Sequence, residues 1–190
     1  METKQQIWCI RHGTALHNVL YNTIGEEAYK SPKYTDTPLV DKGHMESISL
    51  GLSWNETFKI DIVFVSPLTR TIQTAKNIFK DTDVKLVAID EILEFPQGIE
   101  YCNKRKNKSE LQKLNPTIDF SLIPEISTYW KSNENLYELK NRSQKFKDFL
   151  KKRQEKKICI VSHSTFLKEF LFNDVGKIEE EIKHCSPYSY

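Results

Sequence analysis

Short apolar runs alternate with longer amphipathic segments along this chain of 190 residues. Four of the apolar runs predict buried strands, at residues 7–10, 61–65, 84–89 and 158–162. Apolar residues at helical spacing predict helices between and after these strands, at residues 14–21, 41–54, 67–79, 136–153 and 165–172. Because strands and helices alternate, we expect an α/β fold, a three-layer α/β/α sandwich with a mainly parallel central sheet.

Two segments depart from this alternation. Residues 25–38 are polar and contain Pro32 and Pro38, which predicts a loop. Residues 91–130 lack a regular period and contain three prolines, which predicts an irregular insertion that caps one face. No internal repeat, glycine- and serine-rich linker or low-complexity tract divides the chain. We therefore expect a single domain over residues 1–190, with the cap at about 91–130.

Two of the predicted helices show the side on which they are expected to pack. The helix at 41–54 has one face of apolar or small residues, formed by Met45, Ile48, Ser49 and Leu52. The helix at 136–153 has a more strongly apolar face, formed by Leu139, Phe146, Phe149 and Leu150.

Composition and charge exclude several classes of protein. The formal net charge is +2, which gives no argument for binding nucleic acid or an anionic membrane. No apolar run approaches the ~20 residues that cross a bilayer, and the first ten residues lack the basic start and long apolar core of a signal peptide. The four cysteines are widely spaced, and Cys9 and Cys159 lie in strand-like runs. Neither a disulfide framework nor a zinc site is expected, so we predict a cytoplasmic protein in a reducing compartment.

Chemically active side chains gather where three of the predicted strands end. Arg11 and His12 follow the first strand, Ser66 follows the second with Arg70 one turn further on, and His163 follows the fourth. Ligands of open α/β sheets bind outside the carboxyl ends of the strands. If these strands are neighbours, two guanidinium groups and two imidazoles converge there, close to helix N-termini that favour anions. Such a pocket suits a phosphoryl group, because guanidinium groups match the geometry of phosphate oxygens.

The two histidines of this pocket suit two different tasks. A neutral imidazole is a competent nucleophile, and the positive charge of Arg11 favours neutral His12 by lowering its pKa. His163 is suited to stabilise negative charge that develops on the phosphoryl oxygens. A general acid must protonate the leaving alcohol, and we favour Glu94, just past the third strand, with Glu91 as the alternative.

The other histidines carry weaker signals. His17 either contributes to the site or stabilises a turn, and both interpretations stay open. His44 and His184 show no functional pattern. Because His12 and His17 are five residues apart and do not share a helix face, no metal site is expected.

Four blocks of sequence occur in a recognisable order. They are Arg11-His12-Gly13 with His17-Asn18, Asp36-x-Pro38-Leu39 with Gly43, Val65-Ser66-Pro67-Leu68 with Arg70 and Gln73-Thr74-Ala75, and Val161-Ser162-His163. Together they resemble the histidine phosphatases, also called the phosphoglycerate mutase-like superfamily, over nearly the whole chain. A lone Arg-His-Gly would be a weak signal, whereas the four blocks in order are specific.

The resemblance implies roles for these residues. His12 is the phosphorylated nucleophile. The rest of the phosphate pocket is formed by Arg11, Asn18, Arg70 and His163. Glu94, within Ile92-Leu93-Glu94, lies at the family's acid position, although the motif around it is loose. The resemblance also implies that the protein needs no metal and no other cofactor.

Departures from the family pattern bear on the reaction. The cofactor-dependent mutases, as the resemblance implies, are longer and carry a glycine-rich, tyrosine-containing block just after the acid, where this chain has Phe95-Pro96-Gln97-Gly98. We therefore expect a metal-independent phosphomonoester hydrolase that acts on a small phosphorylated substrate. A phosphoglycerate mutase and a catalytically inactive phospho-ligand binding module are the alternatives. A cysteine phosphatase is disfavoured, because no cysteine is followed by an arginine six residues later.

Two basic tracts complete the picture. Residues 140–157 contain nine Lys and Arg, for which a solvated helix face is the favoured interpretation. Four more cations lie in the expected cap, where we hypothesise that they steer or bind a second anionic group of the substrate, namely Lys104, Arg105, Lys106 and Lys108. Neither a nucleic acid nor a membrane partner is expected, and the sequence gives no sign of the oligomeric state.

Overall fold

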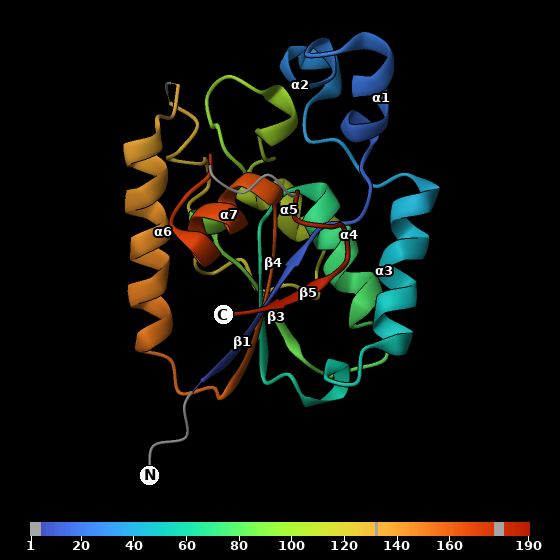
Figure 1. Cartoon of the computed structure of the whole chain (residues 1–190), viewed down its shortest axis with the longest axis vertical. Coiled ribbons are helices and arrows are strands. Elements are labelled where there is room, and N and C mark those ends of the chain that lie inside the picture. Colours follow the sequence, from blue (N-terminus) through green and yellow to red (C-terminus); the bar gives the residue numbers. More distant parts are fainter. Residues whose placement is uncertain (1–4, 132, 177–180) are drawn as a thin grey trace.

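The computed structural model describes residues 5–131, 133–176 and 181–190. Within these residues, one central sheet has the strand order β3-β2-β4-β1-β5 (Figure 1). Its parallel strands are β1 (Gln6–Arg11), β2 (Ile62–Val65), β3 (Lys85–Ala88) and β4 (Lys157–Ser162). The edge strand β5 (Pro187–Ser189) is antiparallel to β1. The predicted α/β fold with a mainly parallel sheet is confirmed.

The centre of the sheet brings the predicted strand ends together. β4 lies between β1 and β2, and its residues 158–162 are buried, which explains an apolar run without alternation. In the ladder Arg11 pairs with Ser162, and Val65 pairs with Val161. The carboxyl ends of the three strands are therefore level at one edge of the sheet.

Helices cover both faces of the sheet, as expected for a three-layer sandwich (Figure 1). On one face, α6 (Leu136–Lys151) and α7 (Ser164–Phe172) pack on the sheet through a cluster that includes Phe146 and Phe166. On the other face lie α4 (Thr69–Ile78) and α5 (Lys108–Leu114), whose cluster includes Ile72 and Leu111. Alternate residues of the strands supply the two clusters, as strand geometry requires.

The predicted face of α3 (Asp41–Ser53) is wrong. Met45 and Leu52 are 65% and 72% exposed, whereas Gly43 and Ser47 are buried. α3 packs mainly on α4 rather than on the sheet, and small residues let the two backbones approach closely. A Cβ at Gly51, for example, would lie 2.5 Å from the carbonyl oxygen of Ile78. Apolar spacing therefore indicated the helix but not its contact side.

Several boundaries differ from the predictions. The segment predicted as a loop at 25–38 follows α1 (Leu16–Ile24) and contains α2 (Glu27–Lys30) and the 3-10 helix η1 (Pro32–Tyr34). A further 3-10 helix, η2 (Thr57–Lys59), precedes β2. Helix α4 begins at Thr69 instead of Pro67. β5 was not predicted, because three residues that include a proline carry too little period to indicate a strand.

The irregular region 91–130 has two parts with different surroundings. Its first part follows the 3-10 helix η3 (Asp90–Ile92), contains η4 (Tyr101–Asn103) and lies above the strand ends. Its second part joins the core, since Leu111 and Phe120 are buried in the α4 cluster. There the backbone of Asp119 exchanges hydrogen bonds with β3, donating to Leu86 at 2.9 Å and accepting from Ala88 at 2.8 Å.

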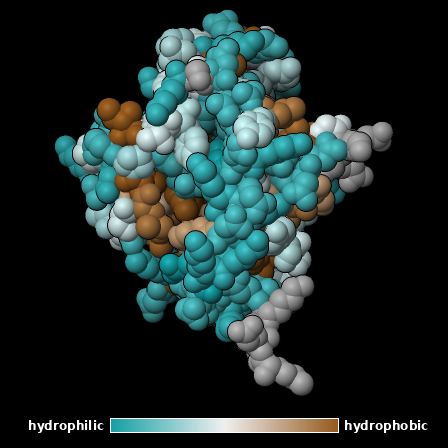
Figure 2. All heavy atoms as spheres, turned by 90° about the vertical axis from the view of Figure 1, so that its left-hand side faces the viewer, coloured by the Kyte–Doolittle hydropathy of each residue, from teal (hydrophilic) through white to brown (hydrophobic). Residues whose placement is uncertain are grey.

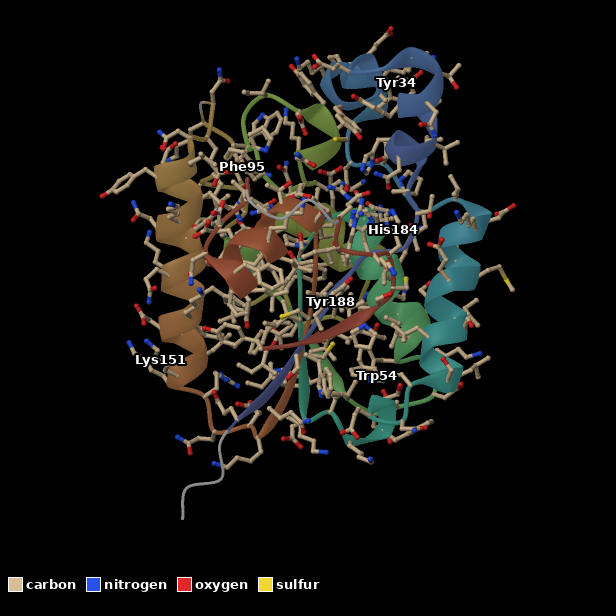
Figure 3. The ribbon with its side chains drawn as sticks, viewed as in Figure 1. Tyr34, Trp54, Phe95, Lys151, His184 and Tyr188 are labelled. Atoms are coloured by element: carbon tan, nitrogen blue, oxygen red, sulfur yellow. The ribbon has the colours of Figure 1, made fainter. Side chains whose placement is uncertain are left out.

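The outer surface of the α6 side is mostly hydrophilic, with a few hydrophobic areas (Figure 2). The solvated face predicted for the basic tract is therefore correct for most of α6, but Arg142 is a clear exception and is 1% exposed. The side chains drawn in Figure 3 place Phe95 and His184 toward the upper end of the sheet, and Lys151 and Trp54 toward its lower end. Among the described residues, no helix is long and apolar enough to cross a membrane. All four cysteines are buried free thiols.

Candidate active site

His12 lies at the end of β1, and its ring orientation is fixed by the backbone. Its N–H donates to the carbonyl of Ser162 at 3.0 Å, which continues the ladder between β1 and β4. Its Nδ1 lies 2.7 Å from the carbonyl oxygen of Gly13. A carbonyl oxygen only accepts hydrogen bonds, so Nδ1 carries the proton and Nε2 keeps its lone pair. The structure thus holds His12 in the tautomer that a nucleophile at Nε2 requires.

Arg70 lies directly against this nitrogen. Its Nε is 3.3 Å from Nε2 of His12, and its side chain is fully buried. The remaining donors bind the irregular segment, with Nη1 donating to the carbonyl of Cys102 at 2.6 Å and Nη2 to Oδ1 of Asn103 at 2.8 Å. Arg70 therefore places a positive charge beside His12 and also anchors η4.

His163 follows β4 and faces the same histidine. Its ring centroid is 5.1 Å from that of His12, and its Nε2 lies 2.8 Å from Oγ of Ser66, at the end of β2. The Nδ1 atom is buried and has no partner among the described residues. When the Ser66 hydroxyl donates to Nε2, Nδ1 carries the proton and remains available as a donor.

Arg11 is buried next to His12 and is only partly engaged. Its Nη1 donates to Oε1 of Glu181 at 2.5 Å and to the carbonyl of Ile182 at 2.9 Å. Its Nε is buried without a partner in the described part of the chain. Buried donors without partners are rare in folded proteins, so Arg11 Nε and His163 Nδ1 mark a place where an acceptor is expected.

Burial and positive charge keep the histidines neutral. Burial is the largest cause that lowers the pKa of His12 well below its usual value, followed by the charge of Arg70, and Arg11 contributes less. The expectation that Arg11 favours neutral His12 had the correct sign but not the main cause. Burial followed by Arg70 lowers the pKa of His163 and of His17 in the same way.

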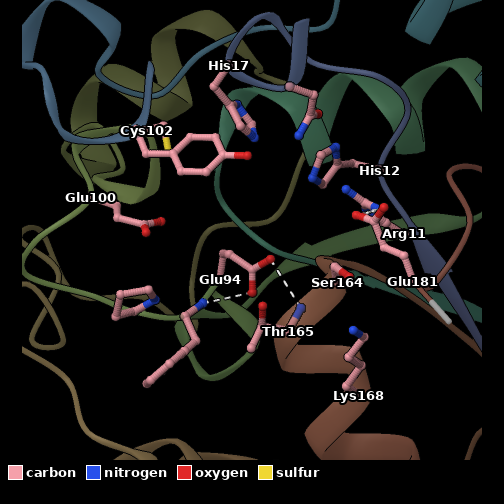
Figure 4. Close-up of a pocket in the computed structure, with 14 residues that line it drawn as sticks. Arg11, His12, His17, Glu94, Glu100, Cys102, Ser164, Thr165, Lys168 and Glu181 are labelled. Carbon is pink, nitrogen blue, oxygen red and sulfur yellow. Dashed lines mark hydrogen bonds and ion pairs between the residues drawn. The ribbon is translucent and has the colours of Figure 1, made fainter. Parts of the chain in front are cut away.

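Glu94 lies across the cavity and is held by α7 (Figure 4). Its Oε1 accepts from the N–H groups of Phe95 at 2.8 Å and Phe166 at 3.1 Å, and its Oε2 accepts from Thr165 at 3.3 Å. The expected anion site at the N-terminus of α7 is thus occupied by a side chain of the protein itself. Glu91 has a different environment, where its carboxylate accepts from the hydroxyl of Tyr129 at 3.4 Å. Glu94 lines the cavity and Glu91 does not.

The cavity has a volume of about 490 Å³, and its wall includes polar and charged residues that the sequence did not indicate. Arg11, His12 and Asn18 line it, whereas Arg70 and His163 are buried behind its wall. Asn18 also accepts a hydrogen bond from the backbone of Ala15 at 3.0 Å, which closes the start of α1.

Sequence reasoning missed several cavity residues. Glu100 and Lys168 line it on either side of Glu94, and burial, followed by the charge of Glu94, raises the pKa of Glu100 to about 7. His184 carries no functional pattern in the sequence and does not line the cavity, but its Nδ1 lies 2.5 Å from the carbonyl oxygen of His12. Lys168 is four residues after Ser164 and three after Thr165, so helical spacing places it near the turn that binds Glu94, and this signal could have indicated it.

His17 also proves to be part of the cavity wall. Its Nδ1 lies 2.5 Å from Oγ1 of Thr37, and its ring is 6.0 Å from that of His12. Both interpretations of His17 thus have a basis, because it fixes the segment around Thr37 and faces the cavity.

The basic residues of the irregular region are engaged elsewhere. Arg105 pairs with Asp90 at 2.8 Å, Lys106 pairs with Asp36 at 2.6 Å, and Lys104 lies over the ring of Trp130 at 5.6 Å. None of them lines the cavity, and neither does Lys108. These side chains are therefore not placed to bind a second anionic group inside the cavity, and steering of an anionic substrate from outside it stays a prediction.

The remaining motif residues hold the loop after β1 in place. A Cβ at Gly13 would lie 2.5 Å from the carbonyl oxygen of Gly43, so both positions require close backbone contact. The N–H of Gly13 donates to Oγ1 of Thr74 at 3.0 Å, and Gln73 accepts from the N–H of Leu39 at 2.8 Å. These contacts explain why the sequence blocks occur together.

Comparison with known families gives a clear result. Residues 7–184 match the model of the histidine phosphatase superfamily, branch 1. The chain belongs to the histidine phosphatase superfamily. A curated relative, phosphoglycerate mutase-like protein 1 of Arabidopsis thaliana, is 32% identical, and the match covers 95% of this chain and 73% of the relative.

Solved structures of proteins named as phosphatases share the fold. The ecdysone phosphate phosphatase of Bombix mori, in complex with tungstate, superposes with a TM-score of 0.73 at 16% identity and covers 98% of this chain and 88% of that chain. The phosphoserine phosphatase of Entamoeba histolytica, in complex with 3-phosphoglyceric acid, has a TM-score of 0.59 at 22% identity, with 97% and 89% covered. Within the described residues of this superfamily member, no three His, Cys, Asp or Glu side chains form a group that could hold a metal ion.

Proposed function

We propose that this chain is a metal-independent phosphomonoester hydrolase that acts on a small phosphorylated substrate through phosphorylated His12. The observation that carries the proposal is the fixed ring of His12. Its Nδ1–H is bound to the Gly13 carbonyl, and its Nε2 lone pair lies beside the guanidinium of Arg70 in a cavity of about 490 Å³. A neutral imidazole held in one tautomer next to positive charge suits attack on an anionic phosphoryl group.

In the first step, Nε2 of His12 attacks phosphorus, the N–P bond forms and the bond from phosphorus to the alcohol oxygen breaks. Glu94, in its protonated form, donates its proton to that oxygen, and the alcohol leaves. Arg11 through Nε and His163 through Nδ1 bind the phosphoryl oxygens, since these donors lack partners among the described residues. The charge of Arg70 stabilises the same oxygens, and Asn18 is an auxiliary ligand.

In the second step, water attacks the phosphohistidine. The Glu94 carboxylate takes a proton from the water, the N–P bond breaks, and inorganic phosphate leaves with His12 restored. Glu94 is favoured over Glu91 for both proton transfers because it lines the cavity.

Relatives support a phosphatase but leave the substrate open. The structural neighbours are named for different phosphoesters, namely ecdysone phosphate and phosphoserine, and one of them holds 3-phosphoglyceric acid. The curated relatives carry the name phosphoglycerate mutase-like. The product formed from 3-phosphoglycerate separates the two reactions, because a hydrolase releases inorganic phosphate and a mutase forms 2-phosphoglycerate.

The decisive experiment traps the intermediate with EDTA present. Wild-type protein mixed with 4-nitrophenyl phosphate and quenched in alkali should gain the mass of one phosphoryl group, which acid then removes. His12→Ala should not form this adduct, and its kcat should be at least about 10⁴-fold lower than that of the wild type. His44→Ala is the matched control, a histidine on α3 outside the cavity, and should keep both. Undiminished turnover by His12→Ala would contradict the mechanism, and tight phosphate binding without turnover of any phosphoester in a broad panel would indicate a binding module.

A further inference from the structure

One arginine of the basic tract lies inside the protein. Arg142, on α6, is 1% exposed although the sequence around it is that of a solvated helix. All five of its N–H donors are used. The acceptors of these donors show which part of the molecule Arg142 holds.

Three of these donors bind the main chain that carries Glu94. Nη1 donates to the carbonyls of Glu91 at 2.9 Å and Leu93 at 2.6 Å, and Nη2 donates to the carbonyl of Glu94 at 3.3 Å. The residues joined in this way are 48 to 51 positions apart in the sequence. A segment without regular secondary structure is thus fixed from outside by one planar side chain.

The other two donors bind a buried carboxylate. Nε of Arg142 lies 2.5 Å from Oε1 of Glu134, and Nη2 lies 3.1 Å from Oε2. Oε2 of Glu134 also accepts from the backbone N–H of Gln97 at 3.0 Å, and the side-chain Nε2 of Gln97 donates to the carbonyl of Glu94 at 2.9 Å. The ion pair therefore fixes the chain on both sides of Glu94.

Arg142 also contacts the element that binds the Glu94 carboxylate. Its Cζ is 5.3 Å from the ring centroid of Phe166, whose N–H donates to Oε1 of Glu94. One guanidinium thus holds the main chain of Glu94 and packs on the first turn of α7. Glu134 and Arg142 do not line the cavity, and the five donors of Arg142 are all bound within the protein, so none is left for the substrate.

We propose that Arg142, neutralised by Glu134, is the positioning residue of the general acid: it sets the place of Glu94 relative to the leaving oxygen. The inference rests on the proposed function, in which Glu94 donates the proton. A proton donor that is displaced by about 1 Å loses much of its effect, because proton transfer requires hydrogen-bond contact. In kcat/KM, which reports the steps up to release of the alcohol, the loss concerns only substrates whose leaving group needs the proton.

Two phosphoesters distinguish positioning from a general structural role. Glycerol leaves glycerol 2-phosphate as a basic alkoxide unless its oxygen is protonated, whereas 2,4-dinitrophenyl phosphate releases 2,4-dinitrophenolate, which is a stable anion without a proton. For Arg142→Lys, kcat/KM for glycerol 2-phosphate should fall roughly 10²-fold, and kcat/KM for 2,4-dinitrophenyl phosphate should change less than about threefold. Lysine keeps the charge but has three donors in place of a planar set of five.

Three further variants complete the test. Arg153→Lys is the matched control, because Arg153 belongs to the same basic tract and pairs with Glu155 outside the cavity. This variant should leave kcat/KM for both substrates unchanged. Asn18→Ala, on the phosphate side of the cavity, should lower kcat/KM for both substrates by the same factor. Glu94→Gln combined with Arg142→Lys should be no slower on glycerol 2-phosphate than Glu94→Gln alone, because both act on one proton transfer.

Equal losses on both substrates, or additive losses in the double variant, would overturn the proposal and leave Arg142 a structural residue. Thermal melting identifies variants that fail to fold. If Arg142→Lys does not fold, Glu134→Gln decides, since it weakens the same clamp and should show the same substrate dependence at smaller size. If His12→Ala remains active, the proposed function fails, and this outcome is distinct from every result with Arg142.

Discussion

The two walls of the cavity are built in different ways. The strand-end wall carries His12, whose backbone continues the parallel ladder of β1 and β4. The opposite wall carries Glu94 and Glu100, and its main chain has no regular secondary structure apart from short 3-10 turns. Buried ion pairs hold this second wall, Arg142 with Glu134 and Arg105 with Asp90.

This difference separates what each wall supplies. Ladder hydrogen bonds fix the nucleophile with backbone atoms, which every residue provides, so the position tolerates changes in neighbouring side chains. The wall of Glu94 depends on particular guanidinium and carboxylate groups, and the loss of one of them leaves a buried charge without a partner. We expect the second wall to be the more sensitive to single substitutions outside the cavity.

The largest effect is expected where this wall is tied to the rest of the fold. Arg105 and Asp90 have side chains 0% and 5% exposed, and Arg105 also donates to the carbonyl of Pro124 at 2.8 Å. Arg105→Ala should lower the free energy of unfolding by about 3–5 kcal/mol in urea denaturation, since it leaves the Asp90 carboxylate buried and unpaired. Lys104→Ala is the neighbouring control and should cost no more than about 1 kcal/mol. Equal stability of the two variants would show that the ion pair does not hold the wall.

The two walls should also respond to pH with opposite signs. On the strand-end wall, burial lowers the pKa values of His12, His17 and His163, so the unfolded chain binds more protons below about pH 6.5. Stability is then lost as pH falls below 6.5, by up to about 1.4 kcal/mol per pH unit for each histidine.

Glu100 on the opposite wall behaves in the reverse way. Its pKa is raised from 4.5 to about 7, so the folded protein binds the extra proton between these values and stability falls as pH rises through them. After allowance for screening by solvent in the cavity, the cost above pH 7 is on the order of 2 kcal/mol. Glu100→Gln should match the wild type below about pH 4.5 and exceed it increasingly toward pH 7 in urea denaturation. A constant difference across this range would contradict the assignment.

The same contrast decides what the sequence could predict. The strand ends were predictable, because apolar runs are local signals and parallel strands bring Arg11, His12 and His163 to one edge. The surroundings of Glu94 were not, because they depend on where an irregular segment meets partners about 50 residues away. Arg142 could not be distinguished from its exposed neighbours, since a basic pattern carries no sign that one member is buried. Glu100 was missed because its approach to the cavity depends on the same path, whereas Lys168 lies on the regular helix α7.

The smallest effect is expected at Arg11, where the strand-end wall also uses an ion pair. The side chain of Glu181 is 68% exposed and forms an ion pair with Nη1 of Arg11, which we propose as a phosphate ligand. Glu181→Gln should change stability by less than about 1 kcal/mol and lower the inhibition constant of inorganic phosphate about two- to fivefold at low salt, because a competing carboxylate is removed. Glu26→Gln, in an exposed pair with Lys30, should leave phosphate inhibition unchanged. Weaker phosphate binding by Glu181→Gln would mean that Glu181 orients Arg11 instead of competing for it, and the strand-end wall would then also depend on a side-chain pair.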